Sequence, residues 1–287
     1  MISAASDQNE RSSAFGKRRG AGAPIRRGFI EVTSGGSSPL ALLLSGANAT
    51  KGGGGRGGRL RVAMVVTLIW QLAKSPHTTI RPARYWAELL DLDDPERAGA
   101  RAVRNTLLEI ERRGFVRTES RGPGKVPEII LMDESLRGAD YKLPFLQAME
   151  EGREGETSYF RVPESFWASG ACSHLSGAGL ALYLIAMSRA GWGNQPSFWL
   201  SPTLFSARYG LGDSTRKKGL KELVDFGIVT QELRSIDVSG RSGYRRFQRS
   251  VYTVTAQYRV PGAPAAAQSD EAVSDFEAFV AANFPNL

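Results

Sequence analysis

The sequence predicts an α+β fold that is mainly α, in which two similar units follow one another along the chain. Two observations support this prediction. Apolar residues recur at helical spacing in several segments of each half, and each set ends in two strand-like segments joined by a glycine-containing turn. The length of 287 residues suits one or two domains, since one core usually serves ~100–200 residues.

Composition divides the chain into five parts. The N-terminal residues are rich in serine, glycine and arginine and show no periodicity, which predicts a disordered basic arm. The C-terminal residues combine a Pro/Ala-rich linker with a short acidic segment that is amphipathic as a helix. The predicted parts are the arm at 1–28, a first domain at 29–133, a polar linker at 134–157, a second domain at 158–260, and the C-terminal linker and helix at 261–287.

Residues that start and stop helices set the limits of the elements in the first domain. Pro82 opens a second helix, and Asp94 caps a third helix whose first position is Pro95. Gly114 ends that third helix, because glycine adopts the left-handed conformation favoured at helix C-termini. We expect helices at 60–72, 83–90 and 95–113, strands at 29–32, 115–120 and 128–132, and a turn at 121–125.

The second domain shows the same signals. Ser176 caps an apolar helix, and Ser201 and Pro202 start the next one. Asp213 caps a third helix, which stops at Gly227. We expect strands at 159–162, 198–200, 229–236 and 247–255, the last two forming a hairpin around a Ser-Gly-Arg-Ser-Gly turn.

The two halves also match residue by residue. Gly114 and Gly227 are related by an offset of 113 in the numbering (227 − 114), and both follow a helix with the pattern Leu-x-x-Ile/Leu-x-x-x-Gly. The same offset pairs Leu107 with Leu220, Ile110 with Leu223, Phe115 with Ile228, Val116 with Val229, Arg104 with Lys217 and Asn105 with Lys218. Two copies are too few for a solenoid, so the match indicates a duplicated domain.

Three helices followed by a hairpin is the order of a winged-helix domain, so we predict two tandem winged-helix domains that bind double-stranded DNA. In the first domain, Val103 marks the buried face of the third helix, and Arg101 and Asn105 point nearly opposite. Arginine can read guanine and asparagine can read adenine in the major groove. The predicted DNA contacts are Arg97, Arg101, Arg104 and Asn105; the alternative is a solvated helix face.

The third helix of the second domain has the same amphipathic arrangement. Leu220, Leu223 and Val224 point inward, which leaves hydroxyl and ammonium groups on the outer face. Serine and threonine can bond phosphate or base edges, and lysine neutralises phosphate. The predicted contacts are Ser214, Thr215, Lys217, Lys218 and Lys221; the alternative for the two hydroxyls is helix capping alone.

Basic residues also occupy both predicted wings. A glycine- and arginine-containing hairpin tip can lie along the backbone or enter a minor groove, although ordinary surface charge explains any one of these residues equally well. The N-terminal arm would add affinity that falls as salt rises, or would serve only as a solubility tail. The wing candidates are Arg121 and Lys125 in the first domain and Arg241, Arg245, Arg246 and Arg249 in the second.

The formal net charge of +8 favours a polyanionic partner, either nucleic acid or an anionic membrane surface. No apolar run reaches the ~20 residues of a membrane span, and no signal peptide is evident. Cys172 is the only cysteine, which excludes an internal disulfide and fits a cytoplasmic location. His77 and His174 show no metal-ligand spacing, so we expect no metal, no cofactor and no enzymatic activity.

Four stretches carry a family resemblance. They are Arg27-Gly-Phe-Ile-Glu-Val32, the segment from Tyr85 to Pro95, the segment from Tyr159 to Trp167, and the segment from Tyr209 to Leu223. Through them, residues 27 to about 258 resemble a family of double winged-helix proteins of high-GC Gram-positive bacteria, and this resemblance implies architecture more than activity. The chain is also similar, more weakly, to plasmid replication initiators, which place two winged helices in tandem.

Three functions remain open at this point. The first is sequence-specific regulation of transcription, with two recognition helices on one chain reading adjacent half-sites. The second is a replication initiator or maintenance protein of a plasmid or mobile element. The third is a protein-interaction module, in which the C-terminal helix with Phe276 and Val280 binds a partner or packs on its own chain. The sequence does not set the oligomeric state.

Overall fold

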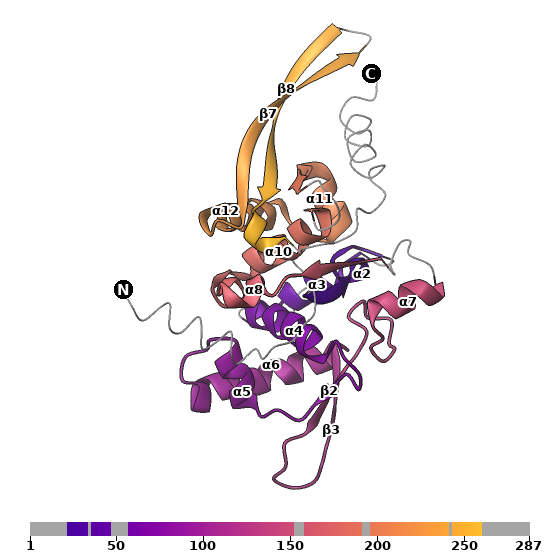
Figure 1. The fold of residues 1–287 in the computed structure, drawn as a ribbon, viewed down its shortest axis with the longest axis vertical. Coiled ribbons are helices and arrows are strands. Elements are labelled where there is room, and N and C mark those ends of the chain that lie inside the picture. The colour runs from indigo at the N-terminus through magenta and orange to yellow at the C-terminus, as the bar shows by residue number, and fades with distance from the viewer. Residues whose placement is uncertain are drawn as a thin grey trace.

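The structure is a computed structural model that describes residues 22–33, 36–46, 57–151, 158–190, 196–240 and 243–259, with the backbone alone at 151, 236–240 and 243–247. It confirms the predicted α+β class, since helices predominate and the sheets are small and antiparallel. The described elements form two units with the same order of helices and strands, and a short lead segment precedes each unit (Figure 1).

Unit 1 consists of a buried helix, a short strand, two further helices and a hairpin. Its elements are α4 (Gly58–Leu72), β2 (Thr78–Thr79), α5 (Ala83–Leu89), α6 (Ala100–Arg112), β3 (Val116–Glu119) and β4 (Glu128–Leu131). The helices and the hairpin fall at the predicted positions. β2 is not predicted from the sequence, because two residues are too few to show a periodic pattern. β2 pairs with β4, so the sheet order is β2-β4-β3.

Unit 2 repeats this order. Its elements are α10 (Gly177–Ala190), β6 (Ser197–Phe198), α11 (Pro202–Tyr209), α12 (Asp213–Asp225), β7 (Val229–Gly240) and β8 (Gly243–Val254). The sheet order is β6-β8-β7, the equivalent of the order in unit 1. The β7–β8 hairpin is longer than predicted, because its pairing continues beyond Ile236 and Phe247 to Gly240 and Gly243.

A nearly constant offset in residue number relates the two units. The starts of α4 and α10 differ by 119 (177 − 58), and so do the starts of α5 and α11 (202 − 83). From the third helix onward the offset is 113, both for α6 and α12 (213 − 100) and for β3 and β7 (229 − 116). The offset becomes smaller because the connection before α6 is longer than the connection before α12. The longer connection contains the π-helical turn Pro95–Gly99.

The third helices end in the same way. Gly114 and Gly227 both have a left-handed backbone, with φ of 83° and 74°. The next residue then turns back to the helix: the Phe115 amide donates to Ile110 O at 3.0 Å, and the Ile228 amide donates to Leu223 O at 2.9 Å. The glycines predicted to stop these helices therefore do so, because residues with a Cβ rarely adopt this conformation.

The lead segments correct two predictions. The lead of unit 1 contains β1 (Ala23–Arg26), α2 (Arg27–Ile30) and α3 (Pro39–Leu44), and that of unit 2 contains β5 (Tyr159–Val162), α8 (Ser165–Ala168) and α9 (Ala171–His174). The predicted arm at 1–28 is wrong for residues 23–28, because β1 is buried and pairs with β5. The predicted strand at 29–32 is wrong as well, because residues 27–30 form a helix. Residues 1–21 lie outside the described residues.

The burial of β1 is not predicted from the sequence, because β1 contains the charged residue Arg26. Its side chain is fully buried, and Nη1 lies 2.5 Å from Glu134 Oε2, whose side chain is also fully buried. Arg26 Nε donates to Gln147 Oε1 at 2.8 Å, and the guanidinium lies over the ring of Tyr141 at 5.2 Å. Burial raises the pKa of the Glu134 carboxyl, while Arg26 opposes that rise. A charged residue is therefore stable in this core strand because a carboxylate faces it.

The predicted linker at 134–157 is wrong for residues 134–151. Glu134 takes part in the buried ion pair, and residues 144–151 form helix α7 (Pro144–Glu151), from which Gln147 contacts Arg26. A polar composition is typical of linkers, but here the polar side chains bind a buried arginine. Residues 152–157 and the predicted C-terminal linker and helix at 261–287 lie outside the described residues.

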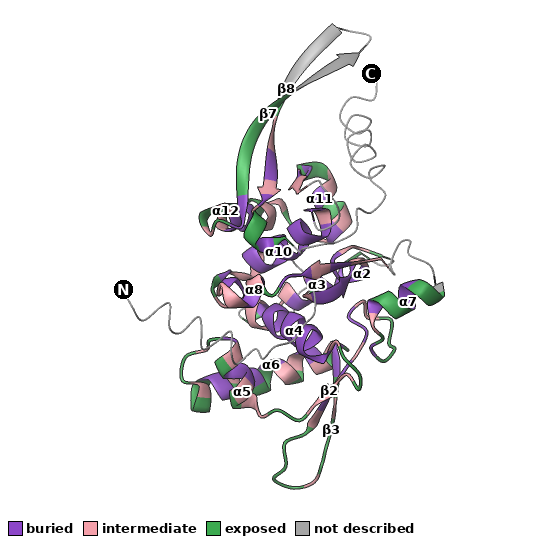
Figure 2. Cartoon of the chain, viewed as in Figure 1, coloured by how far each residue is buried: buried purple, intermediate pink, exposed green. Residues whose placement is uncertain are grey.

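One continuous hydrophobic core extends through both units. α4 and α10 are buried on nearly all sides at its centre, as expected for helices that are apolar around their whole circumference (Figure 2). α6 and α12 lie on either side of this core, and each buries only one face. The two candidate DNA-binding helices are therefore parts of one packed body.

Candidate nucleic-acid interface

α6 is placed by its apolar face and by its caps. Val103 and Ile110 are fully buried on unit 1. The side chain of Asp94 accepts a hydrogen bond from the Ala98 amide at 3.3 Å at the start of the π-helical turn, as the capping prediction requires. The four residues predicted to contact DNA are all exposed: Arg97, Arg101, Arg104 and Asn105.

The charges of α6 are separated along its length. Near its C-terminus, Glu109 pairs with Arg112 at 2.7 Å, and Glu111 accepts hydrogen bonds from the Thr118 amide and hydroxyl at 2.8 and 2.6 Å. Arg101 and Arg104 lie in the first half of α6, and Arg97 lies in the π-helical turn before it. Their guanidinium groups have no ion pair or hydrogen bond among the described residues. This half of the helix therefore presents unneutralised positive charge to an incoming anion.

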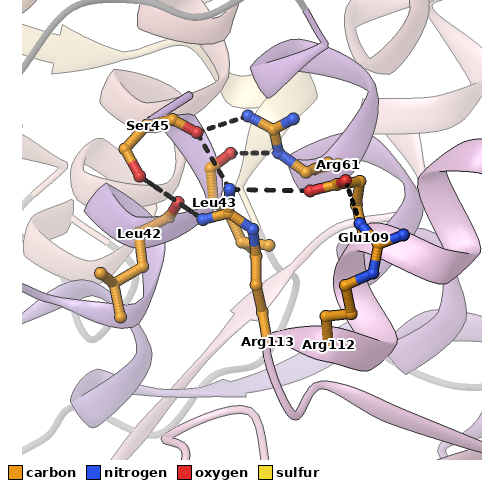
Figure 3. Close-up of polar contacts among 7 residues, drawn as sticks. All are labelled: Leu42, Leu43, Ser45, Arg61, Glu109, Arg112 and Arg113. Atoms are coloured by element: carbon orange, nitrogen blue, oxygen red, sulfur yellow. Dashed lines mark hydrogen bonds and ion pairs between the residues drawn. The ribbon is translucent and has the colours of Figure 1, made fainter. Parts of the chain in front are cut away.

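The C-terminal end of α6 is fixed to the lead of unit 1. Arg113 Nη1 donates to Leu42 O, and its Nη2 donates to Ser45 O at 3.3 Å (Figure 3). Arg61, from α4, donates to Leu43 O at 2.7 Å and to Ser45 O at 2.6 Å (Figure 3). Both guanidinium groups thus satisfy carbonyls at the end of α3, where the helix dipole favours cations. Arg61 and Arg113 hold the helix in place and are not available to DNA.

α12 occupies the equivalent place in unit 2. Ser214, Lys217, Lys218 and Lys221 are exposed, whereas Thr215 is half-buried. Lys217 pairs with Asp213 at 2.9 Å, and Lys221 pairs with Asp225 at 2.7 Å. Hydrogen bonds from Lys217 and Arg216 lower the pKa of the Asp213 carboxyl. Among the described residues Lys218 has no such partner, so two of the three predicted lysines are already paired on their own helix.

The outer faces of α6 and α12 occupy matching positions. At the offset that relates Gly114 to Gly227, Arg101, Arg104 and Asn105 correspond to Ser214, Lys217 and Lys218. The face of α6 therefore offers two guanidinium groups and an amide, whereas that of α12 offers a hydroxyl and two ammonium groups. The two units place different chemistry at equivalent positions.

Leu108 is a candidate that the sequence analysis misses. It is 51% exposed, although it lies beside half-buried Leu107. It lies one helical turn from Arg104 and Asn105, and it corresponds to Lys221 in unit 2. An apolar side chain on this face can contact a thymine methyl group in the major groove. The available signal is its position, about 100° around the helix from Leu107 and about 160° from Ile110.

The wings are described in part. Arg121 and Lys125 are exposed at the turn between β3 and β4, where Gly122 and Gly124 have φ of 107° and 71°. In unit 2, Arg241 lies outside the described residues, and Arg245 and Arg246 are described only by backbone pairing in β8. These five positions stay predictions.

Arg249 behaves differently from the other wing arginines. It is half-buried, and its guanidinium lies over the ring of Trp199 at 5.0 Å. Burial, together with the charge of Arg234, lowers the pKa of Arg249. This side chain therefore packs on the base of the wing and is a poor candidate for reaching a groove.

Comparisons with protein-family models, with curated proteins and with solved structures find no match for this chain. None of the described helices combines the length and the apolar composition that crossing a bilayer requires. Within the described ranges, no three His, Cys, Asp or Glu side chains group as metal ligands do.

Proposed function

We propose that this chain is a sequence-specific double-stranded DNA-binding protein, that its two units are winged-helix domains, and that it regulates transcription. The shared order of three helices and a three-stranded sheet supports the domain type, with β3–β4 and β7–β8 as wings. The observation that carries the proposal is the exposed, unpaired basic face on the first half of α6.

In this account α6 enters the major groove by its first half. Arg101 and Asn105 lie one turn apart on the same face, so both reach base edges from one docked position. Arginine makes paired hydrogen bonds to guanine, and asparagine makes them to adenine, each worth about 1–3 kcal/mol of discrimination. The wing of unit 1 then brings Arg121 and Lys125 to the flanking backbone.

α12 contributes through phosphate contacts. Lys218 is free among the described residues, and a phosphate can replace the carboxylates that now bind Lys217 and Lys221. Exchanging one exposed partner for another costs little, because surface ion pairs contribute only about 0–1 kcal/mol. The formal net charge of +8 adds a sequence-independent attraction that weakens as salt rises.

Selection from fragmented genomic DNA tests the proposal. The full chain is incubated at near-physiological salt with fragments of the genome that encodes it, and the retained DNA is sequenced. Enrichment of promoter sites supports a regulator of transcription. Enrichment of direct repeats beside its own gene identifies a replication initiator and overturns the regulatory role. Salt-sensitive bulk binding without enrichment overturns sequence-specific recognition, and the absence of binding favours the protein-interaction module.

The matched variants are Arg101→Ala and Lys142→Ala. Both remove one exposed positive charge, but Lys142 lies just before α7, where it pairs with Glu150 at 3.4 Å, away from either candidate helix. The proposal requires that Arg101→Ala lose the enriched sites and that Lys142→Ala keep them. Equal effects would show that only the total charge matters.

A further inference from the structure

The two leads are equivalent to each other. Ile25 and Val162 are both fully buried, and their numbers differ by 137 (162 − 25). The same offset relates Phe29 to Phe166 (166 − 29), which are also buried. Each lead thus consists of a short strand, followed by one turn of helix that inserts a phenylalanine into the core.

The pairing of β1 with β5 has two-fold symmetry. At the offset that relates the leads, the counterpart of Ala23 is Phe160, and the counterpart of Ile25 is Val162. The observed pairs are Ala23 with Val162, Pro24 with Arg161, and Ile25 with Phe160. Ala23 therefore pairs with the counterpart of Ile25, and Ile25 pairs with the counterpart of Ala23. Pro24 pairs with its own counterpart, Arg161. This reciprocal pattern is that of an isologous interface, with a local axis between Pro24 and Arg161.

The first helices of the two units begin close together, beside Leu44. α4 begins at Gly58 and α10 begins at Gly177, and these two glycines are counterparts in the two units. A Cβ on Gly58 would lie 2.8 Å from Leu44 O, and one on Gly177 would lie 2.9 Å from Leu44 Cδ2. Both helix starts therefore approach the same residue. Arg59 also donates to Leu175 O at 3.0 Å across this junction.

We infer that one chain acts as a fused pseudo-dimer, binding a single DNA duplex across two inverted half-sites of unlike sequence, with base reading concentrated in the half-site that α6 faces. This inference rests on the proposed function. If a two-fold axis relates the units, α12 runs in the opposite direction to α6. The dyad axis of a DNA duplex relates its two antiparallel strands in the same way. The two wings point to opposite ends of the long axis of the molecule, as this arrangement requires (Figure 1).

The half-sites are unlike because the helix faces are unlike. α6 offers Arg101 and Asn105, whose paired donors and acceptors match guanine and adenine, together with the exposed Leu108. α12 offers Ser214 and lysines, which lack the fixed paired geometry of arginine and asparagine, so we expect them to contact mainly phosphate. The shared core fixes the spacing between the two helices, so no second chain is needed to complete the site.

Selection from a random duplex library, followed by hydroxyl-radical footprinting and native mass spectrometry, tests the inference with the full chain. We expect one chain per duplex and two protected stretches about one helical turn apart. The selected motif should have two inverted parts, one well defined and one degenerate. With Asn105→Ala the well-defined part should lose base preference. With Lys218→Ala the motif should stay the same, while the slope of log affinity against log salt should fall by about 1.

Several results would overturn the inference while leaving DNA binding intact. They are protected stretches in direct orientation, a single protected stretch, two duplexes bound to one chain, or equally well-defined half-sites. A motif that changes with Lys218→Ala but not with Asn105→Ala would also overturn it, because base reading would then belong to α12. Failure to bind any duplex would instead contradict the proposed function itself. Lys142→Ala serves as the control, since it should alter none of these readouts.

Discussion

Trp167 stacks on Trp70 with ring centroids 4.1 Å apart and planes inclined by 13°. Trp70 belongs to α4 in unit 1, and Trp167 belongs to α8 in the lead of unit 2. Trp167 Nε1 also donates to Thr67 Oγ1 on α4 at 3.0 Å. This contact joins the two halves through a buried aromatic pair and a satisfied hydrogen bond, and it makes their relative placement part of the folded core.

Replacing Trp167 tests that coupling. Trp167→Ala should lower the free energy of unfolding by about 3–5 kcal/mol, because it removes a large buried side chain. Trp167→Phe should cost less, since it keeps a ring but loses the hydrogen bond. Urea unfolding followed by far-UV circular dichroism and by fluorescence measures both variants. We expect one transition in the wild-type chain, and separate transitions for the two probes would mean that the units fold independently.

Gly219 lies where α12 crosses α10. A Cβ there would lie 2.4 Å from Ala178 O and 2.7 Å from Leu182 Cγ. Helix propensity alone would make Gly219→Ala stabilising by about 1 kcal/mol. The clash with backbone should outweigh that gain and destabilise the chain by at least about 1–3 kcal/mol, as overpacking does.

Thermal unfolding compares Gly219→Ala with a matched glycine at the start of the same helix. The nearest atom to a Cβ on Gly212 is Ser214 Oγ at 3.8 Å, so Gly212→Ala should change stability by less than about 1 kcal/mol. A Gly219→Ala variant as stable as the wild type would contradict the close packing of α12 on α10.

The buried ion pair of Arg26 and Glu134 should show strong coupling. Arg26→Met leaves the Glu134 carboxylate without its partner in the core, and should cost about 3–5 kcal/mol. The double variant Arg26→Met/Glu134→Gln removes both charges and should recover a large part of that loss. A double-mutant cycle measured by urea unfolding gives the coupling. Additive effects of the two substitutions would mean that β1 is not buried against Glu134.

Cys172 should be unreactive in the folded chain. Its thiol is fully buried, and burial raises its pKa to about 12, so the reactive thiolate is scarce at neutral or mildly alkaline pH. Labelling with a thiol reagent at pH 8 should therefore proceed only as fast as the protein unfolds, and should become rapid in urea. Rapid labelling of the native chain would place Cys172 at the surface.

The sequence predicts the elements whose signals are local. The cap at Asp94, the stops at Gly114 and Gly227, and the apolar faces of α6 and α12 all depend on neighbouring residues, and the structure confirms them. The predicted cap at Asp213 is wrong, because Gly212 holds the cap position and the Asp213 carboxylate pairs with Arg216 and Lys217. The exposed residues of both candidate helices follow from the same periodicity. Their contact with DNA stays a prediction.

The features that the sequence does not predict depend on partners far along the chain. From composition alone, β1 is assigned to a disordered arm. Its burial depends on pairing with β5, far away in the sequence, and on Glu134, which neutralises Arg26. The offset that relates the two leads depends on which of their residues are buried, so it appears only in the folded chain. Leu108 is not predicted as a DNA contact for a different reason, since an apolar residue in a helix is normally interpreted as part of the core.

Binding to a selected duplex is the first measurement to make of DNA recognition through α6. Fluorescence anisotropy would compare the wild-type chain with Arg101→Ala and Lys142→Ala on one labelled duplex, at one fixed salt concentration. We expect Arg101→Ala to weaken binding by about 10- to 100-fold without lowering thermal stability, and Lys142→Ala to bind like the wild type. Unchanged affinity in Arg101→Ala, or equal losses in the two variants, would contradict recognition of DNA through α6.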